Sequence, residues 1–522
     1  MNDSYIDNID SNDCSSVSDD ILPSEFSLTE SEDESQIEIS NPLDDFYKAK
    51  STDDLWRKFP YDESSKLRSP YIIKNRPGLT LEGRTVETVL DSFNLFFNSR
   101  MMYKILSYTN QYAFSKEPSW KNIEISEFKV FIGLLILLGV YKARHEPIRE
   151  IFSGQDGRSI FGNTMKCGRF ELILRYLRFD SRNDRDKNEK DSAIKEVFEL
   201  FRTKLPKGII PGENLTVDEQ LVNFYGRCGF KSYIPSKPGK FGIKLWLLCD
   251  SKTGYCFNQI IYTGKKRKDD KPEKNLGVKV VLDILKTCVV NFKGRTLVTD
   301  NFFTSLSLAE ELYSKKLTLV GTMKNSRKEL PPQFTIKKKR DRYSSLFAFK
   351  QRATLVSYLS RKKKVVNLLS SLHNSVEIGS TVEKKPHIID FYNQNKCGVD
   401  TFDKNVKMYT TRRKSRRWTL VIFLNCLDTA CYNAYITYAT KFPFQCNKSD
   451  SRRKFLIELG KKLIEHEEQI FPLKIGLVSK LSKRKRCSFC KDKDRKTSTL
   501  CNKCNGPICK EHSLNICSYC LK

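Results

Sequence analysis

The sequence predicts a mixed α/β protein in which helical segments flank a sheet-forming region and a small cysteine-rich module follows. Apolar residues recur at three- and four-residue spacing through much of residues 85–213, as they do along one face of a helix. Short runs rich in β-branched and aromatic residues then occupy residues 214–324, which is typical of strands. Seven of the 17 cysteines crowd into the last 36 residues, which in a basic chain indicates metal binding rather than disulfides.

Residues 1–60 are predicted to be a disordered acidic arm. The first fifty residues hold fourteen acidic residues and two lysines, and their few apolar residues lack periodicity, so burial cannot offset the entropy of ordering. The whole chain carries 92 Lys and Arg against 62 Asp and Glu, a formal net charge of +30. The basic excess therefore belongs to the rest of the chain, and the arm either screens it or is only a solvated tail.

The basic excess favours a polyanionic partner, because Lys and Arg gain most where phosphates lie close together and counterions can be released. A small neutral substrate would need no such field, so we expect no small-molecule substrate. The amino terminus has no signal-peptide pattern, and the longest apolar stretch, Val130 to Tyr141, is too short to span a bilayer. We therefore expect no secretion by that route and no association with a membrane.

The helices are predicted from apolar spacing. Residues 86–108, 125–141 and 165–179 each show this spacing, interrupted by polar turns. Residues 306–314 are expected to form a helix between two strands. Residues 418–440 carry apolar residues on several faces, so they predict a buried helix.

The strands are predicted from short apolar runs bounded by Gly, Lys or Asp. Residues 325–385 contain two consecutive prolines, two basic runs and short strand patterns, so we predict a strand-rich insertion in the sheet region. The strands expected before this insertion are residues 215–224, 242–250, 255–264, 295–302 and 318–323.

The terminal segment, residues 487–520, holds four pairs of metal-ligating residues, with two residues between the members of each pair. This spacing lets both members face one ion, and eight ligands close two tetrahedral sites, so we predict two structural Zn²⁺ ions. The segment is too short for an apolar core, so metal binding would supply its folding free energy. Disulfides or free thiols are the alternative. The predicted ligands are Cys487, Cys490, Cys501, Cys504, Cys509, His512, Cys517 and Cys520.

Four aspartates form a candidate acidic site. Asp218 and Asp300 lie in predicted strands, whereas Asp400 and Asp403 are three residues apart and would share one face of a helix. Carboxylates on rigid strands of a basic chain suit two-metal phosphoryl transfer, because they can hold two Mg²⁺ about 4 Å apart. Taken alone, such an aspartate is more often a turn residue, a helix cap or a salt-bridge partner.

Several motifs together resemble the piggyBac transposases and their domesticated relatives. The family often has GGVD at its third acid, and this chain has CGVD, which keeps the glycine nearest Asp400. The motifs, in the family's order, are VDEQLVNFYGRC around Asp218, KPGKFGIKLWLLCDSKTGY at 237–255, TDNFFTS around Asp300, VGTMKNSRKELP at 320–331, YNQNKCGVDTFDK at 392–404, RRWTLVIFLN at 416–425 and the terminal Cys/His module.

The resemblance implies an α/β ribonuclease H-like catalytic core of the DDE/D type. Asp218, Asp300 and Asp400 would form the triad that binds two Mg²⁺, and Asp403 would be an additional essential acid. The implied activity is cleavage and strand transfer at the terminal inverted repeats of double-stranded DNA, with joining to TTAA targets, by a homodimer. The intact acids favour this enzyme over a domesticated DNA-binding protein that acts in chromatin or gene regulation without cutting.

The resemblance also implies a domain order that agrees with the predicted elements. A helical dimerisation and DNA-binding domain would surround the core. Independently of the resemblance, we expect the cysteine pairs to form a cross-brace, in which the first pair joins the third and the second joins the fourth, with sequential pairing as the alternative that the spacing leaves open. The implied boundaries are an arm at 1–60, the helical domain at 85–213 and 410–480, the core at 214–324 and 386–409, the insertion at 325–385 and the zinc module at 487–520.

Eight basic and aromatic residues are candidate DNA contacts. Basic side chains can contact phosphates, and Trp418 resembles a family tryptophan that stacks on a base near the active site. Basic runs are usually solvated faces, however, and Trp418 could equally be a core residue. The basic run at 482–486 is a candidate nuclear localisation signal, so we expect a nuclear protein. The candidate contacts are Lys237, Lys240, Arg412, Arg413, Lys414, Arg416, Arg417 and Trp418.

Overall fold

The computed structural model divides the chain into two compact units, Met1–Leu463 and Ile464–Lys522, which are described separately. The predicted arm up to residue 44 lies outside the described residues. The residues that the structure describes are 45–61, 71–153, 157–186, 188–265, 274–361, 364–468, 480–487, 490, 495–500, 507 and 509.

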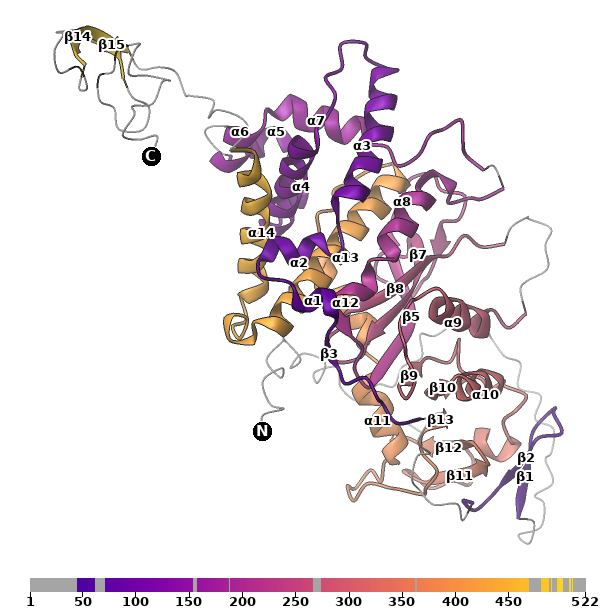
Figure 1. Ribbon diagram of the computed structural model, residues 1–522. Coiled ribbons are helices and arrows are strands. Elements are labelled where there is room, and N and C mark those ends of the chain that lie inside the picture. The colour runs from indigo at the N-terminus through magenta and orange to yellow at the C-terminus, as the bar shows by residue number, and fades with distance from the viewer. Residues whose placement is uncertain are drawn as a thin grey trace. The chain divides into compact units, whose positions relative to one another are not determined.

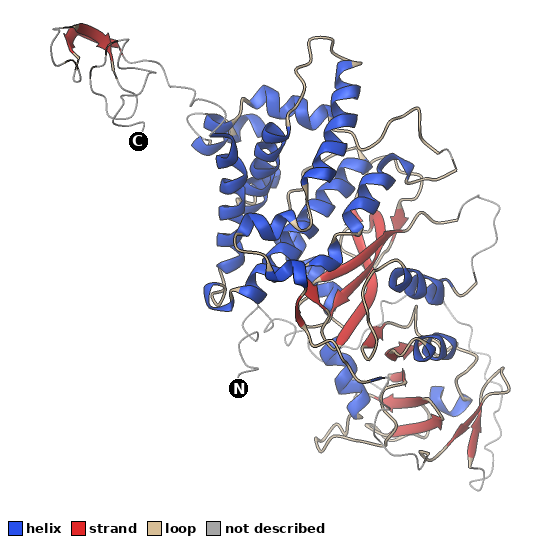
Figure 2. Cartoon of the chain, viewed as in Figure 1, coloured by secondary structure: helices blue, strands red, loops and turns tan. Residues whose placement is uncertain are grey.

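The larger unit is built on one mixed sheet of eleven strands (Figures 1 and 2). At its centre, β5 (Asn214–Asn223) pairs antiparallel with β7 (Phe241–Asp250) and parallel with β9 (Thr296–Thr299). On the outer sides, β8 (Cys256–Ile261) pairs with β7, and β10 (Thr318–Met323) pairs parallel with β9. The parallel connections contain helices, as such crossovers require. This arrangement fits a ribonuclease H-like core, as the resemblance implied.

The predicted insertion, residues 325–385, extends this sheet. Its last strand, β13 (Val365–Ser370), pairs antiparallel with β10, and β12 (Ala353–Leu359) and β11 (Ser345–Lys350) follow in order. The added strands share a hydrophobic core with β9 and β10, because residues of both regions pack in one buried cluster. The members of this cluster are Val298, Val320, Phe347, Phe349, Val356, Tyr358, Val366, Leu368, Ile388, Ile389 and Tyr392.

A hairpin precedes the helices and joins the far edge of the sheet. Its strands are β1 (Phe46–Lys48) and β2 (Leu55–Arg57), and β2 pairs with β11. The prediction of a disordered arm is therefore wrong for residues 45–60. Trp56 explains the difference, because its ring is 1% exposed and its Nε1 donates a hydrogen bond to the Glu329 carbonyl oxygen at 3.0 Å.

Many of the helices gather around α13 (Trp418–Lys441), whereas α9 (Leu276–Lys286) and α10 (Leu306–Ser314) lie away from this group beside the strands, as Figures 1 and 2 show. Early and late segments lie side by side there, because α13 packs against α2 (Val89–Asn94) and α8 (Ser192–Arg202). The apolar helix α4 (Ile125–Val140) is buried along most of its length, as its composition predicted. Among the described helices, none combines the length and the apolar character needed to cross a membrane.

The smaller unit contains the antiparallel pair β14 (Lys480–Arg486) and β15 (Lys496–Thr499).

The remaining described elements are helices and short strands. The helices are α1 (Leu81–Arg84), α3 (Ser99–Phe114), η3 (Ala143–His145), α5 (Ile148–Ile151), α6 (Ser159–Thr164), α7 (Cys167–Tyr176), η4 (Leu205–Lys207), α9 (Leu276–Lys286), α10 (Leu306–Ser314), η5 (Pro332–Thr335), α11 (His387–Asn395), α12 (Gly398–Met408), η6 (Pro443–Gln445) and α14 (Ser451–Glu468), and the short strands are β3 (Gly78–Leu79), β4 (Ile209–Ile210) and β6 (Ser232–Tyr233).

Candidate active site and metal centre

Asp218 and Asp300 lie at matching positions on neighbouring parallel strands. Val217 of β5 is paired with Thr299 of β9, and each aspartate is the next residue along its strand. The turn after β9 fixes the second carboxylate, because the Phe302 backbone N–H donates to Asp300 Oδ1 at 2.9 Å. The register of the two parallel strands thus places the two carboxylates beside each other.

Asp400 approaches these two acids from helix α12, because its charge acts on Asp218. A Cβ atom at Gly398 would lie 2.7 Å from Thr216 Oγ1 and 2.9 Å from the Asp250 carbonyl oxygen, so only glycine permits the helix to begin this close to β5 and β7. The preceding residues are also held, because Thr216 Oγ1 donates to the Asn395 carbonyl oxygen at 3.0 Å. The glycine that precedes the third acid in the sequence motif therefore has a packing reason.

Electrostatics show that these acids share one site. Burial raises the pKa of Asp218 well above its usual value, and the charges of Glu219, Asp300 and Asp400 raise it further. Burial, then Glu219, raises the pKa of Asp300 to about 6. Burial also raises the pKa of Asp400, although Lys237 opposes this shift. A bound cation stabilises the folded protein most where buried carboxylates repel one another.

Buried carboxylates are suitable ligands for hard divalent cations. Within the described residues, three or more possible ligand atoms lie mutually within 4.8 Å only in a cysteine cluster, so the aspartate oxygens are more widely spread. Two Mg²⁺ ions about 4 Å apart require carboxylates on both sides of the ion pair rather than in one tight group. Asp218, Asp300 and Asp400 are therefore the residues that could hold such ions.

Two charged residues at this site, Glu219 and Lys244, are absent from the sequence-based prediction. Glu219 lies between two lysines, with Lys237 Nζ 3.9 Å from its Oε1 and Lys244 Nζ 3.7 Å from its Oε2. Lys244 also lies 3.9 Å from the centre of the Trp246 ring. The signal for Glu219 was its place beside Asp218. No signal in the sequence marks Lys244, because its contact with Glu219 depends on the pairing of β5 with β7.

Asp403 is fixed by a buried polar network. Gln220 Nε2 donates to Asp403 Oδ1 at 2.9 Å, and Gln220 Oε1 accepts a hydrogen bond from Asn425 Nδ2 at 3.0 Å. Lys407 forms an ion pair with the second carboxylate oxygen. Asp403 thus stands next to the acidic site with its oxygens already engaged by donors. Gln220 and Asn425 were also missed, although both are polar residues inside predicted apolar elements.

Three of the candidate DNA contacts are engaged within the protein. Arg412 faces Asp428, with 3.9 Å between Nε and Oδ2, and its side chain is 13% exposed. Arg413 donates to the carbonyl oxygens of Ala143 and Glu146. The structure therefore disfavours phosphate contacts by these two guanidinium groups. Arg417 likewise donates to the carbonyl oxygens of Leu174, Arg175 and Leu177 at the end of α7.

The other candidates have different surroundings. Lys237 lies at the acidic site, where the acids outweigh its burial and raise its pKa. Lys240, Lys414 and Arg416 are exposed. Trp418 is half-buried, and its ring meets the edge of Phe230 with 5.1 Å between centroids.

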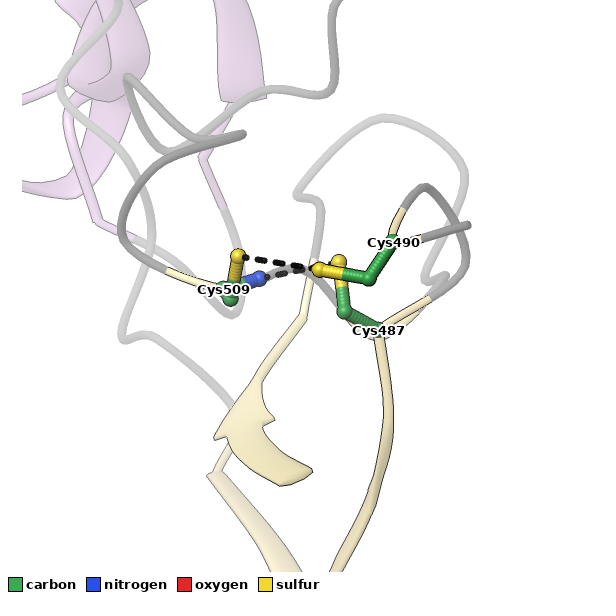
Figure 3. Close-up of side chains that lie close together, drawn as sticks. All are labelled: Cys487, Cys490 and Cys509. Atoms are coloured by element: carbon green, nitrogen blue, oxygen red, sulfur yellow. Dashed lines mark hydrogen bonds between the residues drawn. The ribbon is translucent and has the colours of Figure 1, made fainter. Parts of the chain in front are cut away.

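A cysteine cluster in the smaller unit combines two of the predicted pairs, as Figure 3 shows. Cys487 and Cys490 come from the first pair and Cys509 from the third, and their sulfurs lie within 4.8 Å of one another. The Cys490 and Cys509 sulfurs are 3.8 Å apart. Sulfur ligands at about 2.3 Å from a tetrahedral zinc are about 3.8 Å apart, so these thiols fit such an ion. The predicted ligands Cys501, Cys504, His512, Cys517 and Cys520 lie outside the described residues.

Comparisons with known proteins agree with this geometry. A family model described as Transposase IS4 matches residues 89–435. Human piggyBac transposable element-derived protein 3 is 26% identical in an alignment over 452 residues that covers 80% of this chain and 74% of that protein. Human piggyBac transposable element-derived protein 2 is 24% identical in an alignment over 365 residues that covers 66% of this chain and 60% of that protein.

A solved structure extends the likeness to three dimensions. The piggyBac transposase in a cryo-EM structure of its synaptic complex with hairpin DNA superposes with a TM-score of 0.71 and 30% identity, covering 85% of this chain and all of that one. The sheet and the family match define the class, which is that of the transposases with a ribonuclease H-like core. Within this class, the chain belongs to the piggyBac transposase family, which confirms the resemblance seen in the sequence.

Proposed function

We propose that this protein is a DNA transposase that cleaves DNA and transfers its strands with the help of divalent metal ions. The observation that carries the proposal is that the buried acids Asp218, Asp300 and Asp400 lie close enough to influence one another's charge in a chain of net charge +30. A cluster of buried acids in a basic protein suits a site where cations and phosphates meet.

The chemistry assigns a task to each group. The three aspartates would hold two Mg²⁺, which activate a water or a 3′-hydroxyl and stabilise the leaving oxygen. Lys237 and Lys244 flank Glu219 and can neutralise the phosphate oxygens of an approaching strand. Gln220 holds Asp403 beside the triad through the hydrogen bond described above.

The substrate in this proposal is double-stranded DNA. The relative of known structure was studied as a synaptic complex with hairpin DNA, and the positive charge of this chain suits the same kind of ligand. By the family resemblance, the proposal extends to terminal inverted repeats as the sites of cleavage, to TTAA as the target and to a homodimer as the acting species. It also includes a nuclear location, to which the basic run at 482–486 would direct the protein.

The cysteine module is proposed to hold two structural Zn²⁺ ions. The joining of the first and third pairs in one cluster supports the cross-brace pairing for one site. All four ligands of each ion would come from the protein, so zinc would stabilise the module rather than take part in the reaction.

A domesticated DNA-binding protein is the second candidate, because the human relatives are named as transposable element-derived proteins. Both candidates predict binding to DNA, and only the first predicts nicks in DNA that carries the element's ends. Asp300→Asn should abolish Mg²⁺-dependent nicking and leave DNA binding within about twofold. Asp283→Asn, at an exposed position on α9, is the matched control. Nicking that survives Asp300→Asn would remove this residue from the metal site, and a parent protein that never nicks would favour the second candidate.

A further inference from the structure

Three exposed aromatic rings form one surface on the hairpin that follows β5. Tyr225 is 72% exposed, Tyr233 is 54% exposed and Phe241 is 40% exposed. The Phe241 ring centroid lies 4.7 Å from that of Tyr233 and 6.4 Å from that of Tyr225. Single exposed apolar residues are ordinary on a protein surface, but a contiguous aromatic group in water is not. We refer to these three rings as the hairpin aromatic surface.

The backbone holds these rings in place. Tyr233 of β6 is paired with Phe241 of β7, and the Phe224 backbone N–H donates to the Phe241 carbonyl oxygen at 3.1 Å. The Tyr225 hydroxyl donates to the Gly239 carbonyl oxygen at 3.1 Å. The rings therefore stand on paired strands, and little side-chain entropy remains to be lost when a flat partner stacks on them.

The hairpin aromatic surface has a basic rim. Residues 226–240 include one arginine and three lysines but no acidic residue. Lys231 Nζ lies 5.6 Å from the centre of the Phe241 ring. A Cβ atom at Gly226 would lie 2.8 Å from the Arg416 carbonyl oxygen, so the exposed Arg416 adjoins the hairpin. Positive charge around apolar rings suits a ligand that combines flat faces with phosphates.

The same hairpin leads to the acidic site. Six residues of extended chain separate Asp218 from Phe224, which is about 20 Å at the usual rise of a strand. A nucleic acid strand with stacked bases covers this distance in about six nucleotides. Lys237 belongs to the same hairpin, and its Nζ lies 3.9 Å from Glu219 Oε1, so the segment that carries the rings also reaches the acidic site.

We propose that the hairpin aromatic surface binds unpaired bases of the DNA strand whose phosphodiester lies at the acidic site. The inference rests on the proposed function and extends it to a second contact region. Bases inside a duplex have their faces covered by neighbouring bases, so exposed rings can stack only on nucleotides that have left the duplex. Such nucleotides arise where a DNA end is opened, within about six nucleotides of the reacting phosphate.

The test compares a 12-nucleotide single strand with the same strand lacking its bases. Both carry the same phosphates, so only stacking distinguishes them. Full-length protein without added Mg²⁺ is titrated against each fluorescent strand. The double variant Tyr233→Ala with Phe241→Ala should bind the complete strand about tenfold more weakly and the abasic strand as the parent does. Tyr103→Ala, at a 59% exposed tyrosine on α3, is the control and should change neither affinity.

A second variant distinguishes the loss of stacking from misfolding of the hairpin. Tyr225→Leu keeps apolar volume at the most exposed ring but removes its flat face, so it should also weaken binding of the complete strand alone. Equal weakening for both strands, or none for either, would overturn the proposal. A difference between the variants and the parent in the molecular mass of the DNA-free protein in solution would also overturn the proposal. The rings would then belong to a contact between two copies of the chain. The two proposals can fail separately. If the parent nicks DNA and Asp300→Asn abolishes the nicking, but the ring variants bind both strands as the parent does, this inference is refuted and the proposed function stands.

Discussion

The side-chain amide of Gln220 donates a hydrogen bond to Asp403, with 2.9 Å between Nε2 and Oδ1. Gln220 is 2% exposed, and its amide oxygen accepts from Asn425, which is fully buried in α13. An ionised carboxylate only accepts hydrogen bonds, so its charge determines which end of the Gln220 amide faces it. The orientation of one buried glutamine thus links the central helix to an acid beside the triad.

Gln220→Leu should lower the rate of DNA cleavage by about tenfold to a hundredfold, because a hydrogen bond to a charged group contributes about 1.5–3 kcal/mol. Single-turnover cleavage at saturating DNA measures this rate, and DNA affinity should stay within about twofold. Gln259→Leu is the matched control, since Gln259 is also buried, on β8, but its Nε2 donates to the Cys426 sulfur of the same helix.

A double-mutant cycle separates positioning from a general loss of structure. If Gln220 acts through Asp403, then Gln220→Leu should have little further effect on cleavage in an Asp403→Asn background. Additive losses would show that Gln220 acts elsewhere. A fall in cleavage for Gln259→Leu as large as that for Gln220→Leu would point to packing around α13 rather than to the hydrogen bond.

The stability of the protein without divalent ions should depend on Asp300. Burial, then Glu219, raises the pKa of this carboxyl to about 6, whereas an aspartate in an unfolded chain has a pKa of about 3.9. The folded state therefore keeps this proton between about pH 4 and 6 after the unfolded state has lost it, so the contribution of Asp300 to the free energy of unfolding falls as pH rises through this window. Asp300→Asn should melt a few degrees higher than the parent at pH 7.5, and the difference should shrink toward pH 4.

The same variant should lose the stabilisation that Mg²⁺ provides. Adding Mg²⁺ should raise the melting temperature of the parent and of Asp283→Asn, because the ions bind only the folded state. The melting temperature of Asp300→Asn should respond much less. A variant that melts below the parent at pH 7.5, or one that Mg²⁺ stabilises as strongly as the parent, would contradict the assignment of Asp300 to a repulsive metal-binding cluster.

Substitution of two adjacent arginines should affect two different properties, stability for Arg417 and DNA binding for Arg416. Arg417 donates to three carbonyl oxygens at the end of α7, and burial lowers its pKa to about 10. Arg417→Ala should therefore lower the free energy of unfolding by about 1–3 kcal/mol, measured by urea denaturation. Arg416→Ala, at the exposed neighbour, should leave stability unchanged and reduce the salt dependence of DNA binding by about one unit of slope. A stable Arg417→Ala with weakened DNA binding would instead support the phosphate contact expected from the sequence.

The comparison of these arginines shows what local pattern can predict. The strand at 318–323 and the helix at 306–314 were predicted with their observed bounds, because apolar periodicity is a local property. The interior partners of Arg412 and Arg413 could not be predicted, because they include backbone carbonyls, which leave no mark in the sequence. A run of basic residues looks the same whether it faces solvent or the ends of helices.

Long-range pairing was the other unpredictable part. The strands of 325–385 were expected, but their pairing with β10 depends on residues that are distant in sequence. The burial of Trp56 could not be predicted for the same reason, since its hydrogen-bond partner lies 273 residues away in the sequence. By contrast, the strand patterns around Asp218 and Asp300 could be predicted, because each is a short apolar run, and the register of β5 with β9 places the two acids beside each other as the family resemblance implied.

Removal of zinc should unfold the smaller unit and leave the sheet unit folded. Cys487, Cys490 and Cys509 lie close enough to share one ion, and residues 487–520 are too few for an apolar core. A Cys487→Ser and Cys509→Ser variant should therefore release about one of two zinc ions, measured by elemental analysis, and become sensitive to protease only in the terminal segment. Cys228→Ser, at a half-buried cysteine outside the cluster, should change neither property. Full zinc content in the double variant would exclude these thiols as ligands, whereas protease cleavage throughout the chain would show that the two units depend on each other for stability.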